Sequence, residues 1–230
     1  MAKRVRMSAP ERREQLVGVA RSLFAERGYE ATSIEEIAER AGVSKPVVYQ
    51  HFGGKEGLYA VVVDREVQRL TAAIARSFDA ERPRLIAIEA AENFLTYIEE
   101  HAEGFRVLVR DAPIGMTQGS FATVIADVAA RSEALLRDEF SARGYDERAA
   151  PMYARMLVGA IALVGEWWLE EQQPDREVVA AHVVNLLWNG LGQLQPVDPK
   201  QVRKARKRGE SSLIEGPAAD DTDDPVEVAP

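Results

Sequence analysis

Three side chains between Ser44 and Phe52 carry groups that match the exposed edges of nucleic-acid bases. The amine of Lys45 can reach a phosphate or a guanine edge, and the amide of Gln50 can bond an adenine edge through both of its ends. Val47 can contact a thymine methyl group. A solvated face of an ordinary helical hairpin would contain the same residue types, so the elements that position them decide between the two interpretations.

The sequence around these residues predicts two short helices joined by a tight turn. Ser33 and Glu36 form a capping box, which starts the first helix. Gly42 stops it, because glycine tolerates the left-handed conformation just past a helix end. Ser44 is a favourable cap for the second helix, whose first turn accepts Pro46. Apolar residues at helical spacing give both helices an inward side: Ile34, Ile37, Ala38, Ala41, Val48 and Phe52.

The second helix has an outer face that differs from its inner one. A rotation of about 100° per residue turns Val48 and Phe52 inward. The residues that then lie on or beside the outer face are Lys45, Pro46, Val47, Tyr49 and Gln50. A short helix with such a face meets the requirements of a recognition helix that lies in the major groove of DNA.

Composition limits the class of protein. The chain has 230 residues, of which 46% are hydrophobic and 29% charged, as in globular proteins with one large or two modest domains. It has no cysteine, which excludes disulfides, thiolate metal sites and a cysteine nucleophile. No segment approaches about 20 unbroken apolar residues, and the basic N-terminus lacks the apolar core of a signal peptide. We therefore expect a cytoplasmic protein without a membrane segment.

Charge is distributed unevenly along the chain. The net charge is −8, yet residues 1–55 contain ten basic and seven acidic residues. This contrast fits a DNA-contacting head on a body that does not touch DNA. Residues 1–7 are predicted to be a flexible basic arm, and residues 196–230 a disordered charged tail. The arm and the basic run at 200–208 could add phosphate contacts or remain solvated.

A further helix should brace the pair, and a long one should follow it. Ser8 and Glu11 form a second capping box, and Gly28 ends the helix that begins there. With the pair, this helix would form a small three-helix head at residues 8–54. A long helix is predicted from about Lys55 to Phe78. It would connect the head to the larger remainder of the chain.

Residues 10–60 resemble the DNA-binding domain of the TetR family of bacterial transcriptional regulators. The matching residues are Arg13, Ala20, Leu23, Phe24, Gly28, Tyr29, Thr32, Ser33, Ile37, Ala38, Ala41, Gly42, Val43, Ser44, Tyr49, Phe52, Lys55 and Leu58. The resemblance implies an all-α homodimer. Each chain would have an N-terminal three-helix helix-turn-helix head and a larger C-terminal helical ligand-binding and dimerisation domain, here residues 55–195.

The resemblance also implies roles for individual residues. Phosphate contacts would come from Ser33 and Ser44, and base contacts from Lys45, Val47 and Gln50, with Pro46 on the same outer face. Contacts to the DNA backbone would come from Tyr49, His51 and Lys55. The chain departs from the family pattern at Gly54, where a serine often caps the long helix. Glycine as a cap costs only a few tenths of a kcal/mol, roughly, compared with serine.

Five more helical segments are predicted in the C-terminal part, with a Gly- and Pro-containing loop at 111–119. Their approximate ranges are 84–101, 105–110, 120–142, 147–172 and 175–194. The last two are apolar on two sides, so one side can face the domain core and the other needs a partner. A second copy is the simplest partner, and the predicted homodimer therefore forms through 147–172 and 175–194.

An effector pocket is expected inside the C-terminal helices. Its candidate residues are Phe94, Tyr97, Phe105, Arg106, Phe121, Tyr153, Met156 and Trp168. For each apolar residue among them, the alternative is that it only packs the core. Apolar walls suit a small apolar or amphipathic effector. The segments SKPVVYQHF and AENFLTYIEEHAEGFRVLVRDAP are similar to actinobacterial TetR-type regulators of fatty-acid metabolism, which implies a long-chain acyl-CoA effector.

No catalytic constellation, metal site or cofactor motif is found in the sequence, so we expect no enzyme. Of the three histidines, His51 belongs to the predicted head, and His101 and His182 have no nearby Ser or Cys motif and no metal-ligand spacing. The favoured hypothesis is a repressor that leaves a palindromic DNA operator when an effector binds. The alternatives are a constitutive DNA-binding activator or architectural protein without a ligand, and an effector-binding domain that acts through protein partners. The operator sequence, the target genes and the identity of the effector stay open.

Overall fold

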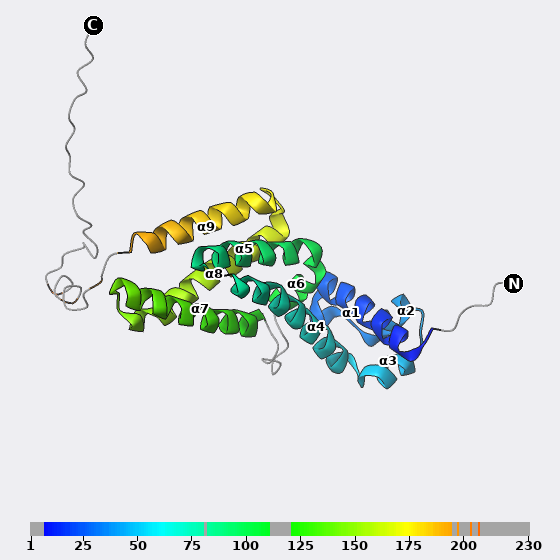
Figure 1. Ribbon diagram of the computed structural model, residues 1–230. Helices are drawn as coiled ribbons and strands as arrows, with labels where there is room; N and C mark the ends of the chain where they lie inside the picture. The colour runs from blue at the N-terminus through cyan, green and yellow to red at the C-terminus, as the bar shows by residue number, and fades with distance from the viewer. Residues whose placement is uncertain are drawn as a thin grey trace, which may run out of the picture. The chain divides into compact units, whose positions relative to one another are not determined.

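The computed structural model describes residues 7–80, 82–110 and 121–194, with residues 197, 203 and 207, and helices form all the regular secondary structure in them (Figure 1). The predicted all-α fold is confirmed. The predicted arm up to residue 6, the loop at 111–119 and nearly all of the tail lie outside the described residues. The chain divides into two units at residue 190. The helices discussed below belong to the first unit, apart from the last residues of the final helix.

The head consists of α1 (Ala9–Ala31), α2 (Ile34–Arg40) and α3 (Lys45–Phe52). Both predicted capping boxes are present: Ser8 with Glu11 starts α1, and Ser33 with Glu36 starts α2. Gly28 interrupts the helical backbone of α1 with a φ of 82°, where the sequence predicts the helix end, although helical residues continue to Ala31.

The long α4 (Lys55–Ala75) ends in a short 3-10 turn, η1 (Arg76–Asp79). Gly54 is its N-cap residue. Glycine is needed at position 57, because a Cβ there would lie 2.1 Å from the carbonyl oxygen of Phe52 at the end of α3. The start of α4 therefore packs tightly against the recognition helix. Its buried residues complete the head core, with members including Leu16, Ala20, Phe24, Ile37, Val48, Leu58 and Val62.

The C-terminal helices that follow α4 and η1 begin with α5 (Pro83–Glu100) and α6 (Ala102–Val109), and α7 (Phe121–Arg143) follows the undescribed segment. A 3-10 turn, η2 (Glu147–Ala149), leads into α8 (Ala150–Glu171), and α9 (Arg176–Gly192) comes last. These bounds agree with the predicted ranges within a few residues. A second hydrophobic core joins α4 to these helices, and includes Leu70, Phe94, Ile98, Phe105, Phe121, Trp168 and Val184.

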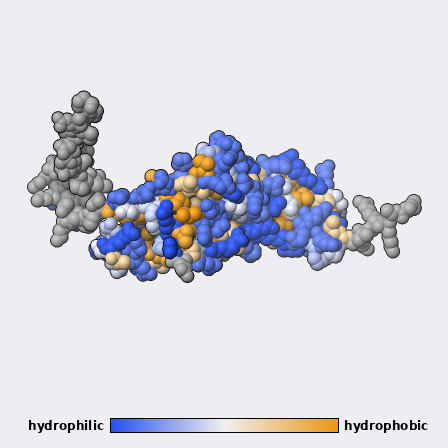
Figure 2. All heavy atoms as spheres, turned by 45° about the horizontal axis from the view of Figure 1, so that its top comes forward, coloured by the Kyte–Doolittle hydropathy of each residue, from blue (hydrophilic) through white to orange (hydrophobic). Residues whose placement is uncertain are grey.

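The two sides of α8 differ as the sequence predicts. Trp168 is buried in the domain core, while the opposite side is exposed at Met152, Met156, Leu163 and Trp167. Orange patches over the C-terminal helices in Figure 2 show that apolar residues reach the surface there. Gly165 faces inward, because a Cβ there would lie 2.3 Å from the ring of Phe94. Its lack of a side chain therefore serves packing within the chain.

The segment Glu147–Glu171 is long and apolar enough to cross a membrane by length and composition, with a hydropathy of 1.2. Only 28% of its apolar window is buried inside the chain. A core or interface helix of a globular protein has the same composition. Here one face packs on α5 and α7, and the other carries the four exposed apolar side chains. The apolar character of α8 is therefore explained by packing on one side and by an uncovered face on the other.

Candidate DNA-binding interface and effector region

The outer face of α3 presents the side chains that the sequence predicts for base contact. Lys45, Pro46, Tyr49 and Gln50 are exposed, and Tyr49 keeps 53% of its surface accessible. Val48 is fully buried on the opposite side. Val47 is half-buried and packs in part against the head core, so only a portion of its side chain is free to touch a base. The head core thus holds α3 with its polar face outward.

The amine of Lys45 forms an ion pair with Glu35 of α2. This hydrogen bond is the main reason why the pKa of Glu35 lies below its ordinary value. Both side chains are about half exposed. A phosphate or a base must therefore compete with Glu35 for Lys45.

The two predicted phosphate-binding serines differ in their hydrogen bonds. The hydroxyl of Ser33 accepts a hydrogen bond from the Glu36 backbone and donates one to the Glu36 carboxylate. Ser44 occupies the N-cap position of α3, but its hydroxyl makes no capping hydrogen bond, which differs from the expected cap. The exposed hydroxyl of Ser44 is therefore the more accessible of the two for a phosphate.

Arg13 of α1 supports the C-terminal end of α3. Its guanidinium lies 4.5 Å from the centre of the Phe52 ring, and Nη1 donates to the carbonyl oxygen of His51 at 3.3 Å. Cationic groups are favourable at the C-terminal end of a helix. The half-buried His51 is thus held through its backbone at the end of the recognition helix.

The side chain of Lys55 makes its contacts with residues of the head. Its Nζ donates to the carbonyl oxygen of Tyr29 at 2.9 Å and lies 4.2 Å from the centre of the Tyr29 ring. These contacts tie the start of α4 to the end of α1, a role that sequence reasoning missed. Contact between Lys55 and the DNA backbone remains a prediction.

Four predicted effector residues meet in one aromatic cluster, formed by Phe94, Tyr97, Phe105 and Phe121. The ring of Phe105 meets those of Phe94 and Phe121 edge to face, at centroid distances of 5.5 and 5.1 Å. Phe94 and Phe121 also border an apolar cavity of about 40 Å³. Trp168 belongs to the same core, and its indole donates to the carbonyl oxygen of Pro174.

The remaining three effector candidates lie apart from this cluster. Arg106 pairs with Glu170 of α8 at 3.1 Å. The ring of Tyr153 packs edge to face on Phe140 at the other end of α7, and Met156 is on the exposed face of α8. A wider, open groove of about 710 Å³ between α5 and α9 contains none of the predicted effector residues.

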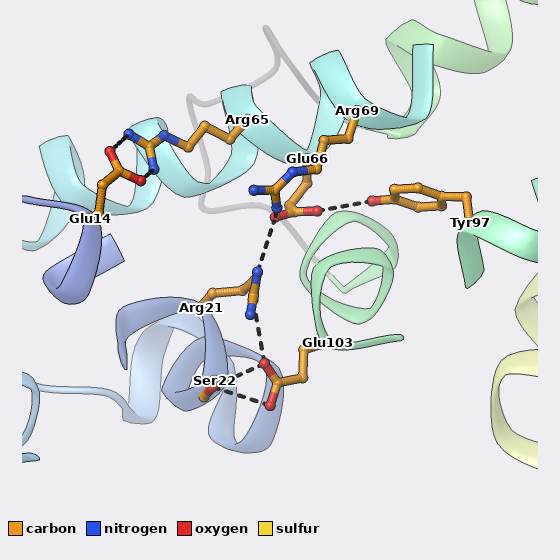
Figure 3. A network of polar contacts seen from close by, with 8 residues as sticks. All are labelled: Glu14, Arg21, Ser22, Arg65, Glu66, Arg69, Tyr97 and Glu103. Carbon is orange, nitrogen blue, oxygen red and sulfur yellow. Dashed lines mark hydrogen bonds and ion pairs between the residues drawn. The ribbon is translucent and has the colours of Figure 1, made fainter. Parts of the chain in front are cut away.

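Sequence reasoning missed Glu66, a carboxylate buried in the middle of α4 with only 2% of its surface exposed. Figure 3 shows that Arg69 and Tyr97 meet this carboxylate and that Arg21 approaches it from α1. A signal existed: Glu66 lies four residues after Val62 and four before Leu70. It therefore stands on the apolar stripe of an amphipathic helix, where a charge needs partners.

Within residues 7–80, 82–110 and 121–194, no group of three or more acidic, histidine or cysteine side chains is placed to hold a metal ion.

A short helix held with a polar face outward, preceded by a second helix and a tight turn, defines the helix-turn-helix class of DNA-binding domains. Residues 16–62 match the family described as "Bacterial regulatory proteins, tetR family". Residues 85–190 match the family described as "Tetracyclin repressor-like, C-terminal domain". The chain belongs to the TetR family, and is a DNA-binding transcriptional regulator.

Similar proteins include both activators and repressors. The HTH-type transcriptional activator FasR of Mycolicibacterium smegmatis is 34% identical over 197 residues, which cover 82% of this chain and 87% of FasR. The HTH-type transcriptional repressor Rv3405c of Mycobacterium tuberculosis is 36% identical over 124 residues, 52% of this chain and 60% of that protein. The crystal structure of a TetR-like regulator from Rhodococcus sp. RHA1 has a TM-score of 0.67 and 28% identity, with 82% of this chain and all of that chain covered.

Proposed function

We propose that this regulator is a homodimeric repressor that binds a palindromic operator in the cytoplasm and leaves it when a small apolar or amphipathic effector binds. The observation that carries the proposal is the outward face of α3, where Lys45, Tyr49 and Gln50 are exposed on a helix held by a complete core. Gln50 suits an adenine edge, and Lys45 suits guanine or phosphate. This face is the part of the head that would enter the major groove.

The exposed apolar residues of α8 and α9 support dimerisation through these two helices. Leu163 and Trp167 of α8 keep 66% and 49% of their surfaces accessible, and Leu186 of α9 keeps 72%. Exposed apolar patches on a globular protein mark interaction sites. A two-fold axis lets the same patch cover its own copy. Regulators of this family dimerise, bind DNA and bind small molecules.

The closed aromatic cluster favours a slender effector. The cavity beside Phe94 and Phe121 has a volume of about 40 Å³. Ligand pockets typically have roughly 300–1,000 Å³. An occupant must therefore push the aromatic rings apart, and an acyl chain requires less opening than a bulky ring system. Arg106 would meet a polar head group after releasing Glu170. These features support a long-chain acyl-CoA as the proposed effector class.

A thermal-shift experiment tests the effector class. Palmitoyl-CoA should raise the melting temperature in a concentration-dependent manner, because a ligand that binds only the folded state stabilises it. Coenzyme A alone serves as the control for head-group binding. If acyl-CoA molecules of every chain length leave the melting temperature unchanged, this effector class is excluded. Native mass spectrometry of the purified protein would then identify any other co-purified ligand.

A gel-shift experiment with DNA from beside the gene for this protein tests the function itself. The expected result is a sequence-specific shift that the effector reverses. Absence of any sequence-specific complex would overturn the proposal, and a shift insensitive to all metabolites would favour a constitutive regulator. A reporter gene placed behind the same DNA decides the sign of regulation. Activation is the second candidate, because the relative similar over 82% of this chain is named an activator.

A further inference from the structure

One buried carboxylate joins the head to the rest of the chain. Glu66 lies in the middle of α4, and its Oε2 accepts a hydrogen bond from the hydroxyl of Tyr97 of α5 at 3.1 Å. Its Oε1 pairs with Arg69 at 2.5 Å and with Arg21 of α1 at 3.8 Å. Helix α6 packs directly on the same group, because a Cβ at Gly104 would lie 2.2 Å from Oε2. Four helices therefore meet at this side chain.

The head contributes to this meeting point through two side chains of α1. Arg21 also pairs with Glu103 of α6 at 3.3 Å, and the hydroxyl of Ser22 donates to the same carboxylate at 2.9 Å. Figure 3 shows Arg21 placed between Glu66 and Glu103. Helix α1 is therefore attached to α4 and α6 at the same place, next to a buried charge. The position of α1 in turn decides where the recognition helix points, because α1 and α3 belong to one packed core.

Burial makes the charge of Glu66 sensitive to the position of the head. A buried carboxylate is unfavourable unless charged or hydrogen-bonding groups compensate it. Arg69 is on the same helix as Glu66 and moves with it, whereas Arg21 and Tyr97 come from other helices. A shift of α1 away from α4 would remove Arg21 from the carboxylate. The network therefore favours one position of the head.

Tyr97 connects the same carboxylate to the aromatic cluster. Its ring meets that of Phe105 edge to face at 6.3 Å, and Phe105 meets both rings that border the cavity. Burial, followed by the charge of Glu66, raises the pKa of Tyr97 well above its ordinary value, so its hydroxyl stays a donor. Repacking of the rings would therefore change the hydrogen bond to Glu66.

We propose that Glu66 and Tyr97 are positioning residues, which fix the orientation of the head and thereby the spacing of DNA half-sites that the dimer accepts. The inference rests on the proposed dimeric operator binding and adds the residues that determine its geometry. A single head on one half-site has no spacing to satisfy. Loss of the network should therefore affect paired half-sites selectively, whereas loss of folding would affect every DNA.

The test uses the full-length protein and an operator that the wild type selects from random DNA. Three duplexes are compared: the selected operator, one isolated half-site, and the operator with one base pair inserted between the half-sites. The insertion rotates one half-site by about 34° relative to the other. Tyr97→Phe removes the hydroxyl and keeps the ring, and Glu66→Gln removes the charge. Tyr145→Phe is the matched control, since it removes a hydroxyl from a ring that packs on Phe140.

The wild type should prefer the selected spacing over the inserted one, and each network variant should reduce this preference by about fivefold or more, as expected for a coupling between sites. Half-site affinity should stay unchanged, and Tyr145→Phe should behave as the wild type. Melting temperatures measured in parallel show whether each variant folds. Gly104→Ala, which pushes on Glu66 from α6, should act in the same direction.

Three results would overturn the inference. The variants could keep the wild-type spacing preference, lose affinity equally for half-site and operator, or share their loss of preference with Tyr145→Phe. A fourth result, in which the wild type binds the operator no better than an isolated half-site, concerns the proposed function and not the network. That result would reject the proposed paired binding itself, and with it the positioning role of Glu66.

Discussion

The three helices of the head bury nearly all of their large apolar side chains, whereas α8 and α9 leave six exposed. In the described part of α1, α2 and α3, Tyr49 is the only large apolar residue with an exposed side chain, and its hydroxyl is polar. The six on α8 and α9 are Met152, Met156, Leu163, Trp167, Val178 and Leu186. A polar surface suits a partner that is hydrated and charged, and an apolar one suits a partner that excludes water.

Because the two surfaces differ in polarity, one chain can bind two kinds of partner. The head core is completed by residues of α4 and α6 and covers the inner side of α3, so the outer face of α3 can be exposed without loss of order. The C-terminal helices α8 and α9 leave apolar side chains uncovered, and the proposed dimer would bury them. If this contrast is correct, substitutions in the two regions should affect different properties. Those on α8 should change dimer assembly, and those on α3 should change DNA recognition.

The largest effect is expected from Leu163→Glu in the exposed face of α8. Burial of one leucine side chain contributes about 1.5–3 kcal/mol. A two-fold dimer would lose this free energy once in each chain, so its dissociation constant should rise by at least about 100-fold. Sedimentation velocity measures this directly. Leu85→Glu is the control, because Leu85 is also an exposed leucine but lies on α5. A dimer that survives Leu163→Glu, or is equally lost with the control, would remove α8 from the interface.

Gln50→Ala tests the recognition face. It should weaken discrimination between operator and random DNA by about 1–3 kcal/mol, because a bidentate contact to one base is lost. The melting temperature should not change, since Gln50 is exposed on α3. Gel shifts on both DNAs give the discrimination ratio. Equal loss of affinity on the two DNAs would exclude Gln50 from base reading.

A comparison of Lys55→Ala with Lys45→Ala separates structural lysines from DNA-binding ones. Lys55 holds the Tyr29 carbonyl and lies over its ring, so its loss should reduce the free energy of unfolding by about 1–2 kcal/mol. Lys45→Ala should instead reduce the salt dependence of DNA binding by one phosphate contact. Urea unfolding and salt titrations measure the two quantities. If Lys55→Ala left stability unchanged and reduced only the salt slope, its main role would be at the DNA.

The smallest effect concerns the acid stability of the head. The Ser33 backbone, followed by its hydroxyl, holds the pKa of Glu36 below its ordinary value of 4.5. A carboxylate with a depressed pKa in the folded state contributes stability above 4.5, and this contribution is lost as the pH falls through the folded value. Glu36→Gln keeps a capping side chain without a titrating group, so its unfolding free energy should fall less between pH 5 and about pH 3. An identical pH profile for both proteins would contradict this account.

The fold was largely predictable because its signals are local. Capping boxes at Ser8 and Ser33 and the glycine at position 28 mark helix ends within a few residues of chain. The stripe on α8 also separates correctly into a buried and an exposed side, since side-chain direction follows from helical periodicity alone. The family membership follows from the density of such signals over residues 16–62.

The contacts inside the site were less predictable, because they depend on helices far apart in sequence. The pairing of Lys45 with Glu35 and the contact of Lys55 with Tyr29 need the packed head before they can be seen. The contacts of Glu66 form only when α1, α4, α5 and α6 are packed together. The predicted effector set divides for the same reason: Phe94 and Phe121 share a cavity, while Met156, on the same helix as the buried Trp168, faces solvent.

Selection of DNA from a random library by the purified wild-type protein shows whether the dimer reads a palindrome through α3. Two exposed recognition helices related by a dimer axis should enrich an inverted repeat with half-sites about 10–10.5 base pairs apart, roughly 34 Å, occupied by two chains. Gln50→Ala should enrich a less restricted motif at the same spacing. Enrichment of an unrepeated motif by the wild type, or of no motif, would contradict the account of a dimer that reads a palindrome through α3.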